Sequence, residues 1–236
     1  MQPPADYGID APNVVRNLAV AAVVALGLAA AFGVWFPPFF WAFLFPGLSC
    51  AATAGLMLWG SKVGKLRLRD RVLDALALHG DERVLDVGCG HGLMLLGAAR
   101  RLTTGKAVGV DIWQKEDQAG NDRKATLENA CRENVADRVE LHDGDARSLP
   151  FADGSFDVVV SSWAIHNIYD APGRGQAVRE IIRVLKARGR VALADIQHAA
   201  EYAAVLRAAG MDQVRLSSPN FLFLIPTRVV TAVKGG

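Results

Sequence analysis

The sequence predicts an α/β protein with a doubly wound, mostly parallel sheet, preceded by an apolar helical hairpin. Two observations carry this prediction. After residue 80, short apolar segments typical of buried strands alternate with helix-like segments. Before it, residues 18–61 contain no Asp, Glu, Lys, Arg or His. The expected strands are 83–87, 107–111, 139–143, 156–161, 190–195, 214–216 and 228–233, and the expected helices among them are 92–102, 123–135, 175–187 and 199–209.

Composition excludes several classes of protein. Of the 236 residues, 51% are apolar and 21% charged, which excludes a disordered chain and is more apolar than an ordinary soluble domain. The net charge of +2 gives no general support for nucleic-acid binding. The three cysteines, Cys50, Cys89 and Cys131, form no CxxC pair. We therefore expect neither a disulfide framework nor a metal site, and a reducing compartment.

The first quarter of the chain contains two apolar runs, residues 14–36 and 39–60, separated by Pro37 and Pro38. As helices they would be about 33 Å long, against a hydrocarbon core of about 30 Å. The runs therefore predict two transmembrane helices. A hairpin that enters one leaflet and a hairpin buried in a soluble core are the alternatives. A cleaved signal peptide fits poorly, because the start of the chain is acidic rather than basic and each run is too long.

The flanking charges predict an orientation. Five basic residues follow the second run within eleven positions, and the turn between the runs carries no charge. The positive-inside rule then places residues after 61, and the amino terminus, in the cytoplasm. We expect a multi-pass protein of the cell (inner) membrane with its α/β domain cytoplasmic. The five basic residues are Lys62, Lys65, Arg67, Arg69 and Arg71.

Small residues recur every four positions in both apolar runs, and such rows let helices approach closely in lipid. Packing of the hairpin's own two helices is the favoured interpretation, and a homodimer interface is the alternative. The residues are Ala21, Ala25, Ala29 and Gly33 in the first run and Gly47, Ala51 and Gly55 in the second.

These features predict four parts of the chain. An N-terminal tail covers residues 1–13 and the transmembrane hairpin residues 14–60. A basic amphipathic connecting helix follows over residues 61–80, with a glycine at its end. Residues 81–236 form the α/β domain.

The first strand of that domain runs directly into the glycine-rich segment DVGCGHG, and a helix follows. Glycines permit a tight turn that a ligand can approach closely, and the helix presents free N–H groups there. The segment is not a P-loop, because no Gly-Lys-Ser/Thr follows. Asp111 ends the second strand about twenty residues later, where a carboxylate can accept both hydroxyls of a ribose. The pattern indicates a nucleoside-bearing cofactor without choosing between cofactors.

Four motifs in this order, DVGCGHG, GVDIW, HDGDARSLPF and FDVVVSSWAIHNI, resemble the class I S-adenosylmethionine-dependent methyltransferases. The resemblance covers roughly residues 65–236. It implies a Rossmann-like, seven-stranded sheet whose last strand is antiparallel, and S-adenosyl-L-methionine as the cofactor. An NAD-dependent enzyme explains the third motif and the closing strand pair less well.

The resemblance also implies roles for individual residues. In that family the acidic residue two positions before the first glycine helps to hold the methionine end of the cofactor. The glycine loop runs beside the amino-acid and ribose portions. The implied residues are Asp86, Gly88, Cys89, Gly90 and Gly92 at the methionine and ribose portions, Asp111 at the ribose hydroxyls, Ile112, Trp113, Asp145 and Ala146 around the adenine, and Ser161 on the methionine side.

Methyl transfer from a sulfonium needs a base only when the acceptor must lose a proton. His166, five residues past the fourth strand, is the candidate catalytic residue, because histidine suits proton transfer near neutral pH. The alternative is that His166 packs in its loop and shapes the acceptor pocket.

A methyltransferase gains nothing chemically from an apolar hairpin, so we expect the hairpin to give access to a lipophilic, membrane-associated small molecule. The apolar segment 221–225 could form a wall of the entry, or be an ordinary buried strand. Two further hypotheses stay open: a soluble acceptor with the hairpin serving only for localisation, and a non-catalytic cofactor-binding membrane protein.

Overall fold

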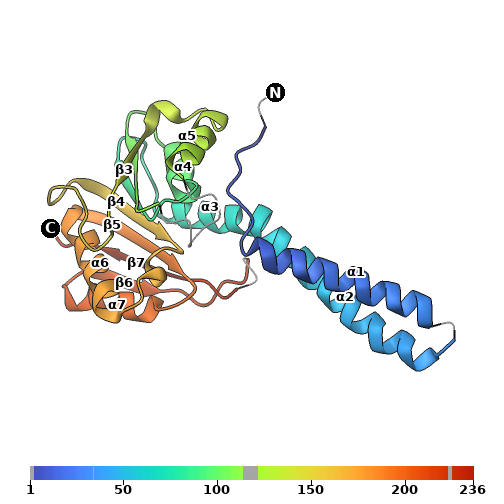
Figure 1. The fold of residues 1–236 in the computed structure, drawn as a ribbon. Coiled ribbons are helices and arrows are strands. Elements are labelled where there is room, and N and C mark those ends of the chain that lie inside the picture. Colours follow the sequence, from blue (N-terminus) through green and yellow to red (C-terminus); the bar gives the residue numbers. More distant parts are fainter. Residues whose placement is uncertain (1–2, 34, 114–121, 223–224) are drawn as a thin grey trace. The chain divides into compact units, whose positions relative to one another are not determined.

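The computed structural model describes residues 3–33, 35–113, 122–222 and 225–236 (Figure 1). These residues form two compact units. The α/β unit comprises Met1–Tyr7, Leu66–Phe221 and Ile225–Gly236, and the hairpin unit comprises Gly8–Lys65 and Leu222–Leu224.

The α/β unit contains a seven-stranded sheet with the order β3-β2-β1-β4-β5-β7-β6. Neighbouring strands are parallel, except that β7 runs antiparallel to β5 and β6. This confirms the predicted doubly wound, Rossmann-like sheet with an antiparallel last strand. The order reverses between β1 and β4, whose carboxyl ends flank the crevice where such sheets bind ligands. The strands are β1 Arg83–Val87, β2 Lys106–Asp111, β3 Val139–Asp143, β4 Phe156–Ser162, β5 Leu185–Asp195, β6 Asp212–Leu216 and β7 Arg228–Val233.

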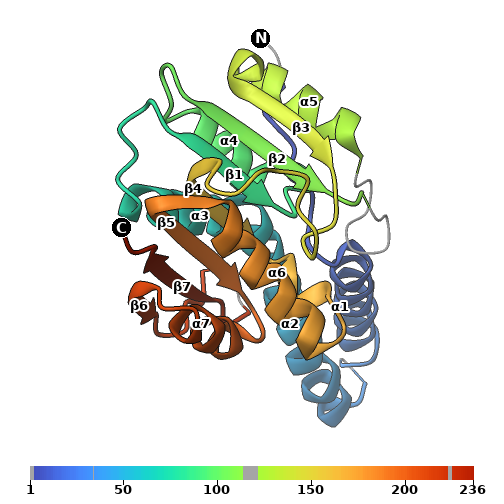
Figure 2. The same cartoon turned by 90° about the vertical axis from the view of Figure 1, so that its left-hand side faces the viewer.

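Helices cover both faces of the sheet (Figures 1 and 2). On one face, Ile181 and Tyr202 pack with Leu85 and Val159 in the main hydrophobic core. On the other, α3 packs so closely on α4 that a Cβ on Gly97 would lie 2.8 Å from the Leu73 side chain. The helices of this unit are α3 Lys65–Ala75, α4 Leu93–Ala99, α5 Arg123–Arg132, α6 Ala171–Val184 and α7 Ala199–Ala208, with short 3-10 turns η2 Ala136–Arg138 and η3 Ile165–Asn167.

Helix α6 differs from the prediction at both ends. It begins at Ala171 rather than residue 175, because the Asp170 side chain accepts a hydrogen bond from the Gly173 amide (2.7 Å) and caps the helix. It ends at Val184, and β5 begins at Leu185 rather than at residue 190. The chain therefore passes from helix to strand without an intervening loop.

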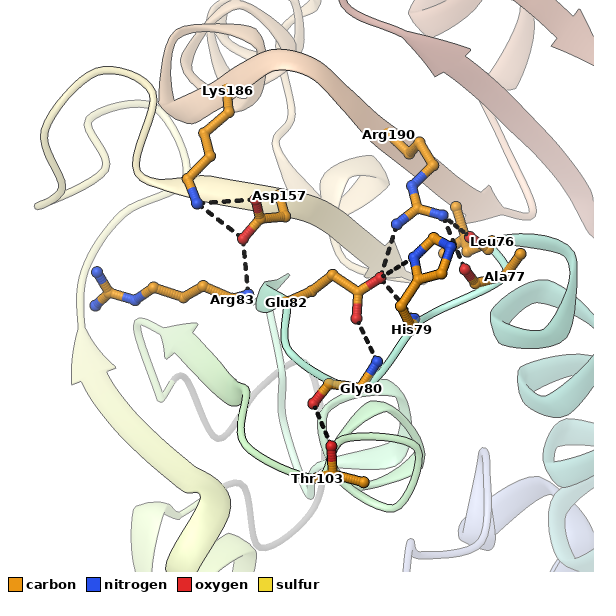
Figure 3. A network of polar contacts seen from close by, with 10 residues as sticks. All are labelled: Leu76, Ala77, His79, Gly80, Glu82, Arg83, Thr103, Asp157, Lys186 and Arg190. Atoms are coloured by element: carbon orange, nitrogen blue, oxygen red, sulfur yellow. Dashed lines mark hydrogen bonds and ion pairs between the residues drawn. The ribbon is translucent and has the colours of Figure 1, made fainter.

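A polar network fastens the end of α3 to the sheet (Figure 3). The Arg190 guanidinium, from β5, donates to the carbonyl oxygens of Leu76 and Ala77 and to Oε1 of Glu82 (2.9 Å). Glu82 also accepts the amide hydrogens of His79 and Gly80, at 2.8 Å each. The carbonyls of the turn that follows α3 are thus satisfied by a charged side chain of the sheet.

The hairpin unit contains two long apolar helices, α1 Pro12–Phe32 and α2 Pro37–Trp59, and a π-helical turn, Gly60–Gly64. By length and composition these helices could span a bilayer, and most of their residues are not buried within the protein. Large apolar side chains such as Val23 (73% exposed) and Phe45 (63%) face outward. A core helix of a soluble protein would instead bury such side chains.

Part of the predicted row of small residues lies between α1 and α2. Ala29 and Gly47 are buried, and a Cβ on Gly47 would lie 2.9 Å from the Leu26 side chain. The packing of the hairpin on itself therefore uses these residues. Ala51 and Gly55 are exposed, and the homodimer interface stays a prediction.

Candidate cofactor and acceptor site

The glycine loop between β1 and α4 is shaped by backbone conformations that favour glycine. Gly88, Gly90 and Gly92 have φ angles of 72°, 46° and 87°. A Cβ on Gly88 would collide with the Cβ of Ala164. The Gly88 amide also donates to the carbonyl oxygen of Val110 (2.8 Å), which ties the loop to β2. The loop therefore passes close to the segment after β4 and leaves no room for a side chain there.

Asp111, at the carboxyl end of β2, is held against this loop. Its Oδ2 accepts the Gly90 amide hydrogen (2.8 Å) and its Oδ1 accepts that of Trp113 (2.7 Å). The indole of Trp113 in turn donates to Asp143 (2.7 Å), and Ile112 is 48% exposed. Asp111, which the resemblance assigns to the ribose hydroxyls, thus lies together with the apolar side chains of Ile112 and Trp113 at the carboxyl end of β2.

Asp86 lies inside β1 and is 2% exposed. Its Oδ2 accepts the Leu95 amide hydrogen (2.9 Å), whereas its buried Oδ1 has no hydrogen-bond partner among the described residues. Burial, with a smaller contribution from the Asp111 charge, raises the pKa of the Asp86 carboxyl to about 7. A buried acceptor without a donor beside a glycine loop fits a cofactor that carries ammonium and hydroxyl groups.

The remaining implied residues have partners of their own. The Ser161 hydroxyl donates to the Val87 carbonyl (2.7 Å). Asp145 pairs with Arg147 (2.6 Å), and this hydrogen-bonded partner lowers the pKa of the Asp145 carboxyl. Burial raises the pKa of the Cys89 thiol well above its usual value, which makes it a poor nucleophile. Ala146 packs on the main core. The cofactor roles of these residues stay predictions.

His166 lies in η3 and faces a buried carboxylate that the sequence did not reveal. Its Nδ1 is 2.6 Å from Oδ1 of Asp195, an ion-pair distance without hydrogen-bond alignment. Asp195 is 2% exposed, and its Oδ2 accepts hydrogen bonds from the Tyr202 hydroxyl (3.1 Å) and the His166 amide (3.2 Å). One sequence signal could have identified Asp195: like Asp111 at the end of β2, it is an acidic residue at the carboxyl end of a strand, β5.

The apolar segment 221–225 is described only in part. Residues 223 and 224 lie outside the described residues. Phe221 is 65% exposed and Ile225 42% exposed, and neither lies in a strand. Phe221 and Ile225 therefore do not belong to a buried strand.

The fold and this site define an α/β domain built to bind a nucleoside-bearing cofactor at the carboxyl edge of its sheet. Residues 85–193 match the family described as a methyltransferase domain. The chain thus contains a class I S-adenosylmethionine-dependent methyltransferase domain, as the four motifs implied. Asp86, Asp111 and the glycine loop are the residues whose geometry fits S-adenosyl-L-methionine.

Curated relatives agree with this assignment. The chain is 39% identical over 132 residues to the 27-O-demethylrifamycin SV methyltransferase of Amycolatopsis mediterranei, covering 55% of this chain and 44% of that protein. It is 39% identical over 110 residues to the demethylmenaquinone methyltransferase of Symbiobacterium thermophilum, covering 46% of this chain and 40% of that protein. The chain thus spans less than half the length of these relatives.

Solved structures share the fold. The [4+2]-cyclase SpnF superimposes with a TM-score of 0.58 at 21% identity, over 72% of this chain and 80% of that one. A geranyl diphosphate methyltransferase in complex with S-adenosylmethionine gives a TM-score of 0.57 at 14% identity, over 72% and 85%. Likeness at this level of identity concerns the architecture alone.

Proposed function

We propose that the protein transfers the methyl group of S-adenosyl-L-methionine to a small lipophilic molecule at the cytoplasmic face of a membrane. The observation that carries the enzymatic part is the contact between Gly88 and Ala164. Because Ala164 is two residues before His166, this contact brings the His166–Asp195 pair beside the glycine loop. This contact supports a role for His166 as a proton acceptor near the bound cofactor.

Bound S-adenosyl-L-methionine supplies an activated methyl group on its sulfonium sulfur. Asp86, Asp111 and the glycine loop hold the cofactor, and positioning the acceptor against the methyl supplies much of the rate. Because Nδ1 of His166 lies 2.6 Å from Oδ1 of Asp195, Nε2 is the nitrogen left to take a proton from an acceptor hydroxyl or amine. Tyr202 donates to Asp195 and so fixes the carboxylate that orients the imidazole. Such a base is worth about 10²–10⁴-fold in rate.

Two features support a lipophilic acceptor. The apolar side chains of α1 and α2 face outward, which suits insertion into a bilayer. Phe221 and Ile225 are exposed beyond the strands, where water-exposed apolar side chains favour an apolar partner. We therefore propose a multi-pass inner-membrane protein with a cytoplasmic methyltransferase domain. A small-molecule acceptor is consistent with the names of both curated relatives.

The four-part division of the chain also stays a proposal: tail 1–13, transmembrane hairpin 14–60, connecting helix 61–80 and methyltransferase domain 81–236. In the structure, Leu66 and the residues after it in α3 belong to the α/β unit, and the tail is divided between the units after Tyr7. The border between the two compact units, after Lys65, therefore differs from the predicted end of the hairpin at residue 60.

The test is to incubate the full chain in mild detergent with methyl-labelled S-adenosyl-L-methionine and whole-cell extract, and to partition the products. Label in the organic phase, absent with the Asp111→Ala variant, supports the proposal and provides the product for mass spectrometry. Label confined to the aqueous phase contradicts the lipophilic acceptor. Cofactor binding without label in either phase favours the non-catalytic hypothesis.

A further inference from the structure

The N-terminal residues 3–7, here called the strap, are fastened to helix α5 although they form no helix or strand. The backbone of Asp6 pairs with the Asn129 side chain: its N–H donates to Oδ1 (2.9 Å) and its carbonyl accepts from Nδ2 (2.9 Å). Directly after the end of α5, Glu133 accepts a hydrogen bond from the Tyr7 hydroxyl (3.0 Å). Tyr7 is 7% exposed, and the Arg69 guanidinium lies 6.0 Å from the centre of its ring. The strap is therefore an ordered part of the α/β unit.

The same face of α5 supports the glycine loop. The Thr126 hydroxyl donates to the Gly90 carbonyl (2.6 Å), and Nδ2 of Asn129 donates to the His91 carbonyl (3.1 Å). Thr126 is 0% and Asn129 2% exposed. On the other side of the loop, the Gly90 amide donates a hydrogen bond to Asp111. The loop is thus held between the ribose-binding carboxylate and two buried side chains of α5.

Asn129 connects the strap with the loop. Its oxygen accepts from the strap, and its Nδ2 group donates both to the strap and to the loop. Without the strap, a buried amide would lose two of these three bonds and would reorient to recover partners. Its bond to the His91 carbonyl would then no longer be fixed.

We propose that the strap, acting through Asn129, positions the glycine loop and thereby sets the affinity for the cofactor. The inference rests on the proposed function in one respect, that the glycine loop binds S-adenosyl-L-methionine. Asn129 and the backbone of Asp6 are positioning groups, because neither needs to touch the cofactor.

The strap also continues directly into the hairpin unit. There, Lys65, which is 4% exposed, donates to the Gly8 carbonyl (2.8 Å) and pairs with Asp10 (3.3 Å). Consequently, removing residues 1–60 would delete the strap together with the hairpin. Such a truncation would weaken cofactor binding even if the hairpin served only for localisation, so point substitutions are the sharper test.

The experiment measures the Kd for S-adenosyl-L-methionine by calorimetry on the full chain in mild detergent. Asp6→Pro removes the N–H that Asn129 accepts, whereas Asp6→Ala keeps both backbone groups and is the matched control. We expect Asp6→Pro and Asn129→Ala each to raise Kd about fivefold, and Asp6→Ala to change it less than about twofold. The double variant should bind about as well as Asn129→Ala alone, because both changes act through one amide.

Two readouts separate positioning from general damage. The KM for the cofactor should rise with Asp6→Pro while kcat at saturating cofactor stays within about twofold, because bound cofactor re-forms the loop. Hydrogen exchange should quicken at the amides of residues 90–95 and not in β5.

Thr126→Val should also raise Kd, because it removes the direct bond from α5 to the loop, and Thr126→Ser should restore binding.

An unchanged Kd in folded Asp6→Pro overturns the inference, as does a double variant whose effects simply add. If Asp6→Pro fails to fold, Tyr7→Phe replaces it, with a smaller increase in Kd expected and an unchanged Kd again contradicting the inference. Absence of cofactor binding by the unmodified chain would instead contradict the proposed function.

Discussion

Glu82 and Asp86 lie four residues apart at β1, and their carboxyl pKa values are shifted in opposite directions. Burial by itself would raise both. At Glu82, hydrogen bonds from the His79 and Gly80 amides and from Arg190 outweigh burial and lower the pKa to about 2. At Asp86, burial prevails over the single amide of Leu95 and raises the pKa to about 7. The ionised Glu82 carboxylate therefore stabilises the fold, whereas ionisation of Asp86 lowers the stability of the folded protein.

Asp86→Asn should change how stability depends on pH. Because the folded-state pKa of Asp86 lies above its usual value, the protonated form is favoured in the folded protein. Its contribution to stability therefore falls as pH rises from about 4 to about 7. The difference in free energy of unfolding between Asp86→Asn and the unmodified chain should therefore shift in favour of Asp86→Asn by on the order of 2 kcal/mol from pH 5 to pH 8. Denaturant unfolding at both pH values measures the gain, and an equal difference at both would contradict the assignment.

Glu82→Gln should show the opposite dependence. The folded-state pKa of Glu82 is lowered, so its contribution is present above its usual pKa and lost as pH falls toward about 2. At pH 7 the substitution should cost about 1.5–3 kcal/mol, because charged hydrogen bonds to Arg190 and two amides are weakened. The control is Asp157→Asn, whose pair with Lys186 (2.8 Å) lies nearer the surface and should cost less than about 1 kcal/mol (Figure 3). A Glu82→Gln deficit that does not shrink between pH 7 and pH 3 would contradict this account.

The centre of the sheet could be predicted from the sequence because β1, β2 and β4 are short, mostly apolar segments bounded by glycines and charged residues. The start of α6 was predicted four residues late. Pro172, Gly173 and Gly175 are typical of a loop, but proline is tolerated in a first helical turn and Asp170 supplies the cap.

The partners of the site residues could not be predicted in the same way. Asp195 is 29 residues from His166 and approaches it because β4 and β5 are neighbours, with Ser162 beside Ala194. Asp6 and Asn129 are 123 residues apart, and a tail without periodicity gives no signal for such a pair. Sequence patterns identify groups at strand ends, whereas contacts between side chains depend on strand order and packing.

Asp111→Asn should leave the fold intact and weaken cofactor binding. An asparagine can still accept one amide hydrogen in place of the two that Asp111 accepts from Gly90 and Trp113. It loses the charged acceptor that we propose for the ribose hydroxyls, so we expect Kd for S-adenosyl-L-methionine to rise about tenfold or more. Calorimetry measures the change. Asp143→Asn is the control, because Asp143 contacts the Trp113 indole and pairs with Arg123 (3.7 Å), and an asparagine there can still accept the indole hydrogen. Equal binding by Asp111→Asn and the unmodified chain would exclude Asp111 as the ribose ligand.

His166→Ala should separate catalysis from cofactor binding. If His166 removes a proton from the acceptor, kcat should fall by about 10²–10⁴-fold while Kd for the cofactor stays nearly constant. Added imidazole should restore part of the rate, because it can occupy the vacated space beside Asp195. Asp195→Asn should lower kcat in the same direction, since the imidazole loses the carboxylate 2.6 Å from its Nδ1, and Tyr202→Phe should have a smaller effect. The pocket-shaping alternative predicts a raised KM for the acceptor, a kcat within about threefold of the original and no response to imidazole.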